Sequence, residues 1–220
     1  MSEIKKLLIS FYYSFLDLIY NQKCLICGCS KVNNLLCKTC LKDVQFLSSF
    51  PHRIYKDIPI YSMSKYENNI KKLIHLLKFK HKKNSAKILS QLLFSYFQKL
   101  ELKKDFILVY PSSSFLKSAW RGYEHMFLIV KEFSKLTNFK YKKDLIKKTK
   151  PTKPQYQVKN RHKNIKNSFS INKKYIKNLK DKNILLIDDI TTTGATLEEI
   201  INCFLNNDIK NIICLTISKT

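Results

Sequence analysis

Acidic residues are scarce in this sequence. Only 16 Asp and Glu stand against 41 Lys and Arg, a formal net charge of +25, which argues against a calcium-buffering protein. Such a charge attracts polyanions: nucleic acid, phosphorylated small molecules or an anionic membrane. Hydrophobic residues still make up 45% of the 220, so the chain can bury a core and is not wholly disordered. The length suits one medium domain with a small appendage.

Arginine and glycine are scarce too, and this weakens the charge argument. The 41 basic residues include only three arginines, Arg53, Arg121 and Arg161, whereas proteins that read nucleic acid usually rely on the forked guanidinium. A chain rich in Lys and Asn, with only 3 glycines, is also typical of a compositional bias. The positive charge therefore leaves two interpretations open, a polyanion-binding surface or a merely solvated one.

Long apolar runs are missing. The longest, residues 7–20, is interrupted by Asp17 and is shorter than the roughly 20 residues of a membrane-spanning helix. No small-residue cleavage site of a signal peptide follows it, so we expect no membrane span and a cytoplasmic protein. The apolar stripe predicts an amphipathic helix over residues 1–20, packed on the body of the protein or docked on a membrane surface.

Cysteine, by contrast, is concentrated: five of the 7 lie between positions 24 and 40. They include two C-x2-C pairs, and each pair can hold one edge of a tetrahedral zinc ion. Without a secretory signal, this pattern predicts structural zinc in a reducing compartment rather than disulfides. The predicted ligands are Cys24, Cys27, Cys37 and Cys40.

Residues 21–50 are therefore expected to form a small zinc element that folds around its metal, because so short a segment has little core of its own. Gly28 allows backbone N–H groups to turn toward the sulfurs. Cys29 stays open as a replacement for Cys27. An iron–sulfur cluster and free thiols are the alternatives to zinc.

The rest of the chain alternates between strand and helix patterns. Short runs of Ile, Val and Leu predict strands buried on both faces, and apolar residues at i, i+3, i+4 and i+7 predict helices. Their alternation predicts an α/β domain with a mostly parallel sheet over residues 51–220. The expected strands cover 106–110, 184–187 and 212–217, with 54–63 extended, and the expected helices cover 41–47, 70–77, 84–102, 123–136 and 196–205.

One segment of this domain is unusually basic. Residues 140–166 hold eleven Lys and Arg, one acid (Asp144) and two prolines. This composition predicts a mobile polar excursion rather than core.

The sharpest motif follows the expected strand 184–187. Asp188 and Asp189 come directly after it, and hydroxyl residues with one glycine then lead into a helix. In an open α/β sheet, ligands bind beyond the carboxyl ends of the strands, where loop N–H groups and a helix N-terminus can hold a phosphate. Two acids beside such a loop favour a sugar phosphate with magnesium nearby. A capping box formed by Thr196 and Glu199 is the structural alternative for those two residues.

This motif resembles the phosphoribosyl pyrophosphate (PRPP) signature of type I phosphoribosyltransferases over thirteen consecutive positions. The resemblance implies the sheet of that family, with helices on both faces. It also implies that Asp188 and Asp189 hold the ribose hydroxyls and that Mg²⁺ accompanies PRPP. The 5′-phosphate would be held by Thr191, Thr192, Thr193, Gly194, Ala195 and Thr196.

The four-cysteine element before such a domain resembles the ComF family of bacterial competence proteins, over about residues 20–218. Arg121-Gly-Tyr-Glu-His125 is similar to a family motif, as are Thr152-x-x-Gln155 and Arg161-x-x-Asn164. If the domain is catalytic, Asp188 and Asp189 belong to its catalytic site, and backbone donors with Arg121 or nearby lysines assist electrostatically.

One departure from the family leaves the function open between two classes. Where ComF proteins often have Pro-Val-Pro-Leu-His, on the pyrophosphate side, this chain has Tyr110-Pro-Ser-Ser-Ser114. An active enzyme would displace pyrophosphate from ribose C1 with a nitrogen nucleophile beneath the basic excursion, in nucleotide or cofactor metabolism. The other class is a competence protein that uses the site to bind PRPP.

The competence role, which we favour, implies imported single-stranded DNA as a partner, together with other competence proteins at the inner face of the inner membrane. Residues 68–100 carry eight lysines and no acid, and with residues 140–166 they could follow a DNA backbone. Base-stacking platforms among these charges would be Tyr96, Phe97, Tyr141 and Tyr156.

Overall fold

The computed structural model describes residues 23–30, 35–102, 104–112, 122–149 and 165–220. Its contacts divide the chain into one unit that ends at Asp43 and a second that runs from Val44 to Thr220. The expected helix over residues 1–20 and most of the basic excursion, 150–164, lie outside the described residues.

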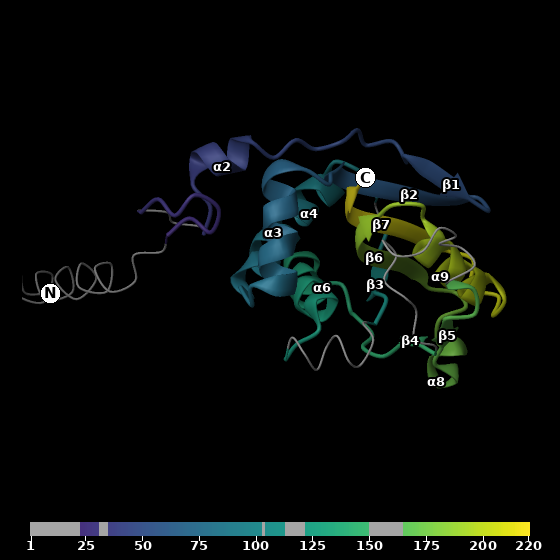
Figure 1. Cartoon of the computed structure of the whole chain (residues 1–220). Helices are drawn as coiled ribbons and strands as arrows, with labels where there is room; N and C mark the ends of the chain where they lie inside the picture. The colour runs from purple at the N-terminus through teal and green to yellow at the C-terminus, as the bar shows by residue number, and fades with distance from the viewer. Residues whose placement is uncertain (1–22, 31–34, 103, 113–121, 150–164) are drawn as a thin grey trace, which may run out of the picture. The chain divides into compact units, whose positions relative to one another are not determined.

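A five-stranded sheet organises the second unit (Figure 1). The strand order is β1-β2-β7-β6-β3; β1 pairs antiparallel with β2, and every other pair is parallel. The sheet is thus mostly parallel, as predicted. The bounds are β1 Arg53–Tyr55, β2 Ile58–Lys65, β3 Phe106–Val109, β6 Asn183–Thr191 and β7 Ile212–Lys219.

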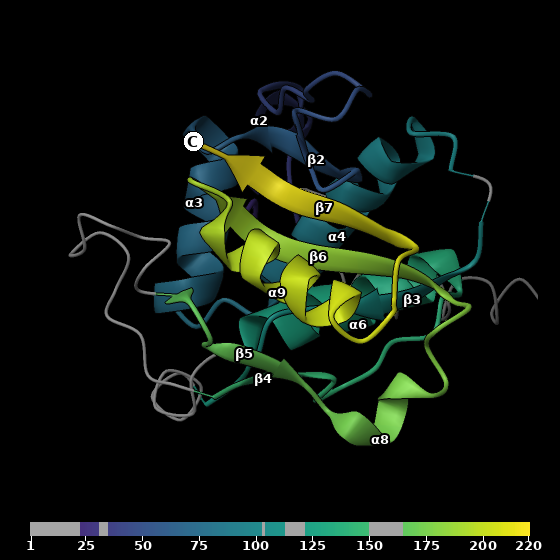
Figure 2. The ribbon, with the colours of Figure 1, turned by 90° about the vertical axis from the view of Figure 1, so that its right-hand side faces the viewer.

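Helices cover both faces of this sheet. The helices α3 (Asn68–Phe79), α4 (Asn84–Gln98) and α6 (His125–Thr137) pack on one face. The other face is covered by α9 (Ala195–Leu205), and Figures 1 and 2 both show these two layers. The fold class predicted from the sequence is confirmed.

A second, two-stranded sheet packs against α9. It consists of β4 (Ile146–Lys148) and β5 (Phe169–Ile171), which pair antiparallel, and the short helix α8 (Lys173–Ile176) follows. Ile146 and Phe169 belong to the same buried cluster as residues of α9 and β6. Part of the predicted polar excursion therefore contributes to the core, because Leu145, Ile146 and Ile165 are each at most 2% exposed although lysines surround them in the sequence.

The central strand β6 carries the site. Ile184, Leu185, Leu186 and Ile187 are each 0% exposed, which explains the continuous apolar run: a parallel strand covered on both faces has no solvent side. The strand continues through the two aspartates to Thr191.

Two predicted elements differ from the structure. The helix expected over 41–47 is instead α2, Lys38–Lys42, and residues 44–48 have no regular structure. The Cys37 side chain caps the N-terminus of α2 by accepting the Cys40 N–H, so the cysteine pair starts the helix earlier than its apolar residues suggest. The extended segment 54–63 is a hairpin whose turn includes Lys56 and Asp57, both at positive φ.

Candidate functional site

The loop after β6 is short and lies at the carboxyl end of a central parallel strand. Thr191 ends β6, and α9 begins at Ala195 after Gly194, whose φ is +81°. A small hollow is lined by Asp188, Ile190, Thr191, Thr192 and Gly194–Leu197. The structure thus brings five of the six predicted phosphate-loop residues and Asp188 together around one space, whereas Thr193 and Asp189 do not line it.

The capping box considered for this helix does not form. The N-cap of α9 is Gly194, and Thr196 is already inside the helix. The Glu199 carboxylate accepts a hydrogen bond from the backbone N–H of Asn167 at 2.6 Å. Glu199 therefore contacts the segment before β5 instead of capping α9.

Asp188 faces this hollow. Burial raises the pKa of its carboxyl to about 7, and the neighbouring charge of Asp189 adds to the shift. Two groups act in the opposite direction: the Asp189 N–H, which donates to Asp188 Oδ1 at 2.8 Å, and the charge of Lys78. A proton or a bound cation therefore stabilises this carboxylate near neutral pH.

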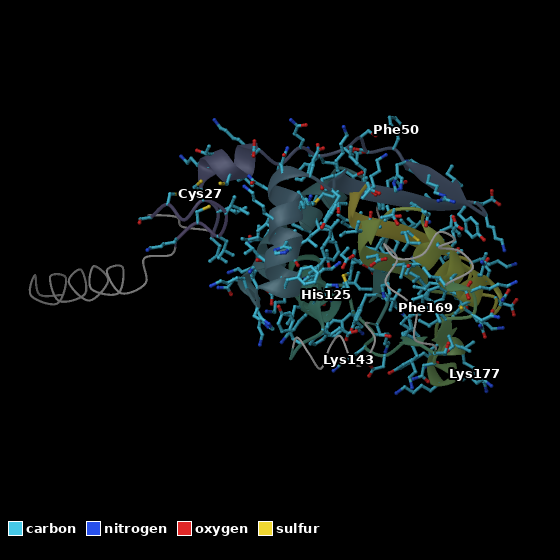
Figure 3. All side chains as sticks on the ribbon, in the orientation of Figure 1. Cys27, Phe50, His125, Lys143, Phe169 and Lys177 are labelled. Atoms are coloured by element: carbon cyan, nitrogen blue, oxygen red, sulfur yellow. The ribbon has the colours of Figure 1, made fainter. Side chains whose placement is uncertain are left out.

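Asp189 lies on the opposite side of the strand. Its Oδ2 is 2.5 Å from Lys78 Nζ at the end of α3 and 2.6 Å from His125 Nε2 at the start of α6. Figure 3 labels His125 on the side of the sheet that these helices cover. Burial acts to raise the pKa of Asp189, but Lys78 and His125 outweigh it and hold that pKa well below its ordinary value.

Sequence reasoning did not assign roles to Lys78 or His125. Lys78 is one of eight lysines in a basic stretch, and nothing in the sequence separates it from its neighbours. His125 belongs to the family-like motif that begins at Arg121, but the motif does not say what the ring contacts. Arg121 itself, predicted to assist catalysis, lies outside the described residues, as do residues 113–120.

Arg53 is a further contact of the loop that the sequence did not predict. From β1 its Nη1 donates to the carbonyl oxygen of Thr193 at 2.5 Å, and its Nη2 forms an ion pair with Glu198 in the first turn of α9. The sequence offered one signal for a special role of Arg53: it is one of only three arginines among 41 basic residues.

The cysteines of the first unit gather into one cluster. The sulfurs of Cys24, Cys27, Cys29 and Cys37 lie within 4.8 Å of one another. Cys27 Sγ and Cys37 Sγ are 3.7 Å apart, close to the roughly 3.8 Å expected for two sulfurs that bind one tetrahedral zinc at about 2.3 Å. The donor set and its spacing fit zinc.

The structure keeps open which cysteine would be the fourth ligand. Cys29, the alternative noted from the sequence, joins three of the predicted ligands in the cluster. Cys40 is also close: burial raises the pKa of its thiol, and hydrogen bonds with Cys37, Cys27 and Cys24 add to this. Four sulfurs therefore lie close enough to share one ion, and Cys40 lies beside them.

The thiol of Cys24 has a lowered pKa, which favours the form that binds a metal. Burial acts to raise its pKa, but hydrogen bonds from the backbone N–H groups of Cys27, Cys37 and Ile26 lower it to about 6. The thiolate is the form that binds zinc. Gly28, at φ +74°, closes the turn by donating its N–H to the Cys24 carbonyl at 2.9 Å.

Two of the predicted stacking platforms are wrong. Tyr96 is 0% exposed and donates its hydroxyl to the Ser48 carbonyl at 2.6 Å, while Phe97 is 7% exposed among other phenylalanines. Both residues belong to the apolar stripe of α4, so helical periodicity decides their place. Tyr141 is half-buried and packs edge-on against Phe127, and Tyr156 lies outside the described residues.

Six lysines of the predicted basic surface are exposed. They lie on α3, on the turn that follows it and at the start of α4: Lys71, Lys72, Lys80, Lys82, Lys83 and Lys87. No helix in the described part of the chain is long and apolar enough to cross a membrane.

Comparison with known proteins places the loop after β6 in a recognised domain. Residues 129–219 match the family model described as the phosphoribosyl transferase domain. The chain is 25% identical over 154 residues to the DNA utilization protein YhgH of Escherichia coli strain K12, and equally to those of E. coli O157:H7 and Shigella flexneri. These matches cover 66% of this chain and 65% of each relative.

The match and the mostly parallel sheet define a protein with a type I phosphoribosyltransferase-like domain. The N-terminal cysteine cluster and the similarity to DNA utilization proteins agree with the resemblance to ComF proteins.

Proposed function

We propose that this protein binds magnesium-loaded PRPP in the loop after β6 and acts in natural transformation, in the handling of imported single-stranded DNA. The observation that carries the first part is the placement of Asp188, Thr191, Thr192 and the residues from Gly194 to Thr196 around one hollow, at the carboxyl end of a central parallel strand. The similarity to DNA utilization proteins supports the second part.

Different residues of the site bind different parts of PRPP. The N–H groups and hydroxyls of the loop 192–196 hold the 5′-phosphate, assisted by the positive end of α9. Asp188 accepts hydrogen bonds from the ribose hydroxyls. Asp189, already held by Lys78 and His125, fixes the end of β6 instead of meeting the sugar directly.

Magnesium fits the Asp188 carboxylate, which lines the hollow. Mg²⁺ is usually held by one or two carboxylates together with substrate phosphates and water, and Asp188 supplies one such group. When bound, the ion neutralises charge on the pyrophosphate.

Imported DNA would lie on the lysines of α3 and the following turn. Phosphate contacts of this kind are independent of sequence and need no guanidinium fork. By its resemblance to ComF proteins, the chain would act in the cytoplasm beside other competence proteins at the inner face of the inner membrane.

Calorimetric titration with PRPP and Mg²⁺ tests the ligand. The wild type should bind PRPP and Asp188→Asn should bind it at least tenfold more weakly, while the exposed Asp57→Asn, which removes the same charge, should bind normally. Equal affinity in all three proteins would contradict the assigned site, and no binding by the wild type would contradict the proposed ligand.

Single-stranded DNA binding is tested by its salt dependence. Log K should fall linearly with log salt, because each lysine–phosphate contact releases counterions, with a slope of about −0.7 per contact. Replacing Lys80, Lys82 and Lys83 by Ala should flatten the slope by about two units, whereas Lys173, Lys174 and Lys177 near α8 serve as a matched triple control. Binding that ignores salt would contradict the electrostatic surface.

An active phosphoribosyltransferase is the second candidate, because the hollow and its carboxylate are also what such a reaction uses. Pyrophosphate release from PRPP across a panel of nucleobases and amines would support it. PRPP binding with no release across the panel would favour the ligand-binding role.

A further inference from the structure

Arg53 connects the edge of the sheet to the loop after β6. It lies on β1, outside residues 129–219 that match the phosphoribosyl transferase domain. Its guanidinium reaches the Thr193 carbonyl and the Glu198 carboxylate at the same time. The hairpin of β1 and β2 thus places the Arg53 guanidinium against the loop at Thr193 and against the first turn of α9 at Glu198.

The negative charge of Glu198 is unfavourable for binding a phosphate in the loop before α9. This residue lies in the first turn of α9, is 7% exposed, and its charge would oppose an anion bound at the same helix end. An acid near a helix N-terminus favours the helix, but it competes with a phosphate for the same N–H groups. The guanidinium neutralises this carboxylate without removing it from the helix.

Gly194 makes the contact possible. An ideal Cβ at this position would lie 2.6 Å from Arg53 Nη1, so a side chain there would displace the guanidinium from its present position. The residue also has φ +81°, which other residues rarely adopt. The glycine of the loop therefore serves the approach of Arg53 as well as the turn.

We propose that Arg53 is a positioning residue for the phosphate-binding loop. It holds the Thr193 carbonyl away from the hollow and cancels the charge of Glu198, so that the N–H groups of the loop meet the 5′-phosphate without an opposing carboxylate. This inference rests on the proposed binding of PRPP. It adds a contact from outside the matched domain to that site.

Four proteins test the proposal by PRPP titration: wild type, Arg53→Met, Arg53→Lys and the double variant Arg53→Met/Glu198→Gln. Arg53→Met should lose about tenfold or more in affinity, since both a charge-assisted hydrogen bond and the neutralisation of Glu198 are lost. Arg53→Lys keeps the charge but not the fork, so its loss should be smaller. The double variant should recover part of the affinity, because the carboxylate charge is removed while the contact with the Thr193 carbonyl stays lost.

A spectroscopic readout separates positioning from general loss of structure. In the ³¹P spectrum of bound PRPP, the 5′-phosphate signal should shift in Arg53→Met while the diphosphate signals stay in place. Wild-type affinity in Arg53→Met, no recovery in the double variant, or equal shifts of all three signals would each overturn the role of Arg53. Absence of PRPP binding by the wild type would instead overturn the proposed function.

Discussion

The Asp189 carboxylate and the His125 ring share a short contact, with Oδ2 2.6 Å from Nε2. Lys78 approaches the same oxygen, so two cationic or donating groups from α3 and α6 meet one carboxylate. Asp188, one residue earlier, accepts the Asp189 N–H, forms no ion pair with the residues that the structure describes, and lines the hollow beside α9. Successive side chains of a strand point to opposite faces, so the two aspartates lie in different surroundings. The pKa of Asp188 is raised and that of Asp189 is lowered.

Stability should respond to pH in a way that identifies Asp188. Its pKa is raised to about 7 in the folded protein, so its contribution to stability is fully present below about pH 4 and is lost as the pH rises through 7. Asp188→Asn removes this loss. Relative to wild type, the variant should gain about 1–3 kcal/mol between pH 4 and pH 8, less than the full 1.4 kcal/mol per pKa unit because the side chain keeps some contact with water.

Urea unfolding at the two pH values measures this gain, with Asp57→Asn as the matched control for one lost carboxylate. A gain for Asp188→Asn that is the same at pH 4 and pH 8 would contradict the assignment.

Removing Lys78 should destabilise the protein. Lys78→Met leaves the buried Asp189 with only His125 as a partner, and breaking one side of a buried ion pair costs about 3–5 kcal/mol. We expect about 2–4 kcal/mol at pH 7, because the Lys78 side chain is 17% exposed. The exposed Lys72→Met on the same helix is the control and should change stability by less than about 0.5 kcal/mol.

The pH dependence of this loss has the opposite sign to that of Asp188. The pKa of Asp189 is held low, so its contribution is present above about pH 4 and declines as the pH falls further. The cost of Lys78→Met should therefore shrink in acid. A cost that grows below pH 4 in urea unfolding would refute the ion pair.

The sequence predicted the sheet and the loop because both depend on local patterns. Ile184–Ile187 is a buried apolar run, and the residues from Asp188 to Thr196 form a motif whose place at a strand end follows from the order of elements. The difference between the two aspartates was not predictable, because Lys78 and His125 are brought there only by the packing of α3 and α6. Arg53 was missed for the same reason, as it lies about 140 positions from Thr193 along the chain.

The two glycines at positive φ in the second unit should differ in their tolerance of alanine. Gly122 has φ +69° and nothing within 4 Å of an added Cβ, whereas at Gly194 that Cβ would lie 2.6 Å from Arg53 Nη1. Gly122→Ala should cost about 1 kcal/mol from backbone strain. Gly194→Ala should cost about 1–2 kcal/mol, because the Arg53 guanidinium must also move aside and this adds to the strain.

The excess cost at Gly194 should disappear when Arg53 is shortened. A thermal unfolding cycle with Gly194→Ala, Arg53→Ala and the double variant measures this coupling. Strictly additive losses would mean that the guanidinium does not limit residue 194.

Zinc removal should unfold the first unit and leave the second intact. Each described cysteine of the first unit lies in the sulfur cluster or beside it, and so short a segment folds by binding its metal. The unit from Val44 onward has its own buried core, so chelation should leave its thermal transition unchanged.

Serine variants should identify the fourth ligand by zinc content. Cys24→Ser, Cys27→Ser and Cys37→Ser should each lose most of the zinc, since their sulfurs lie in the cluster. We expect Cys40→Ser to behave like them, because Cys40 is 8% exposed and completes a C-x2-C pair with Cys37. Cys29→Ser, at an exposed position, should retain zinc, and the reverse result would make Cys29 the ligand. Full zinc content in all five variants would instead contradict a cysteine-bound metal, since a tetrahedral site that loses one of its four thiolates binds zinc far more weakly.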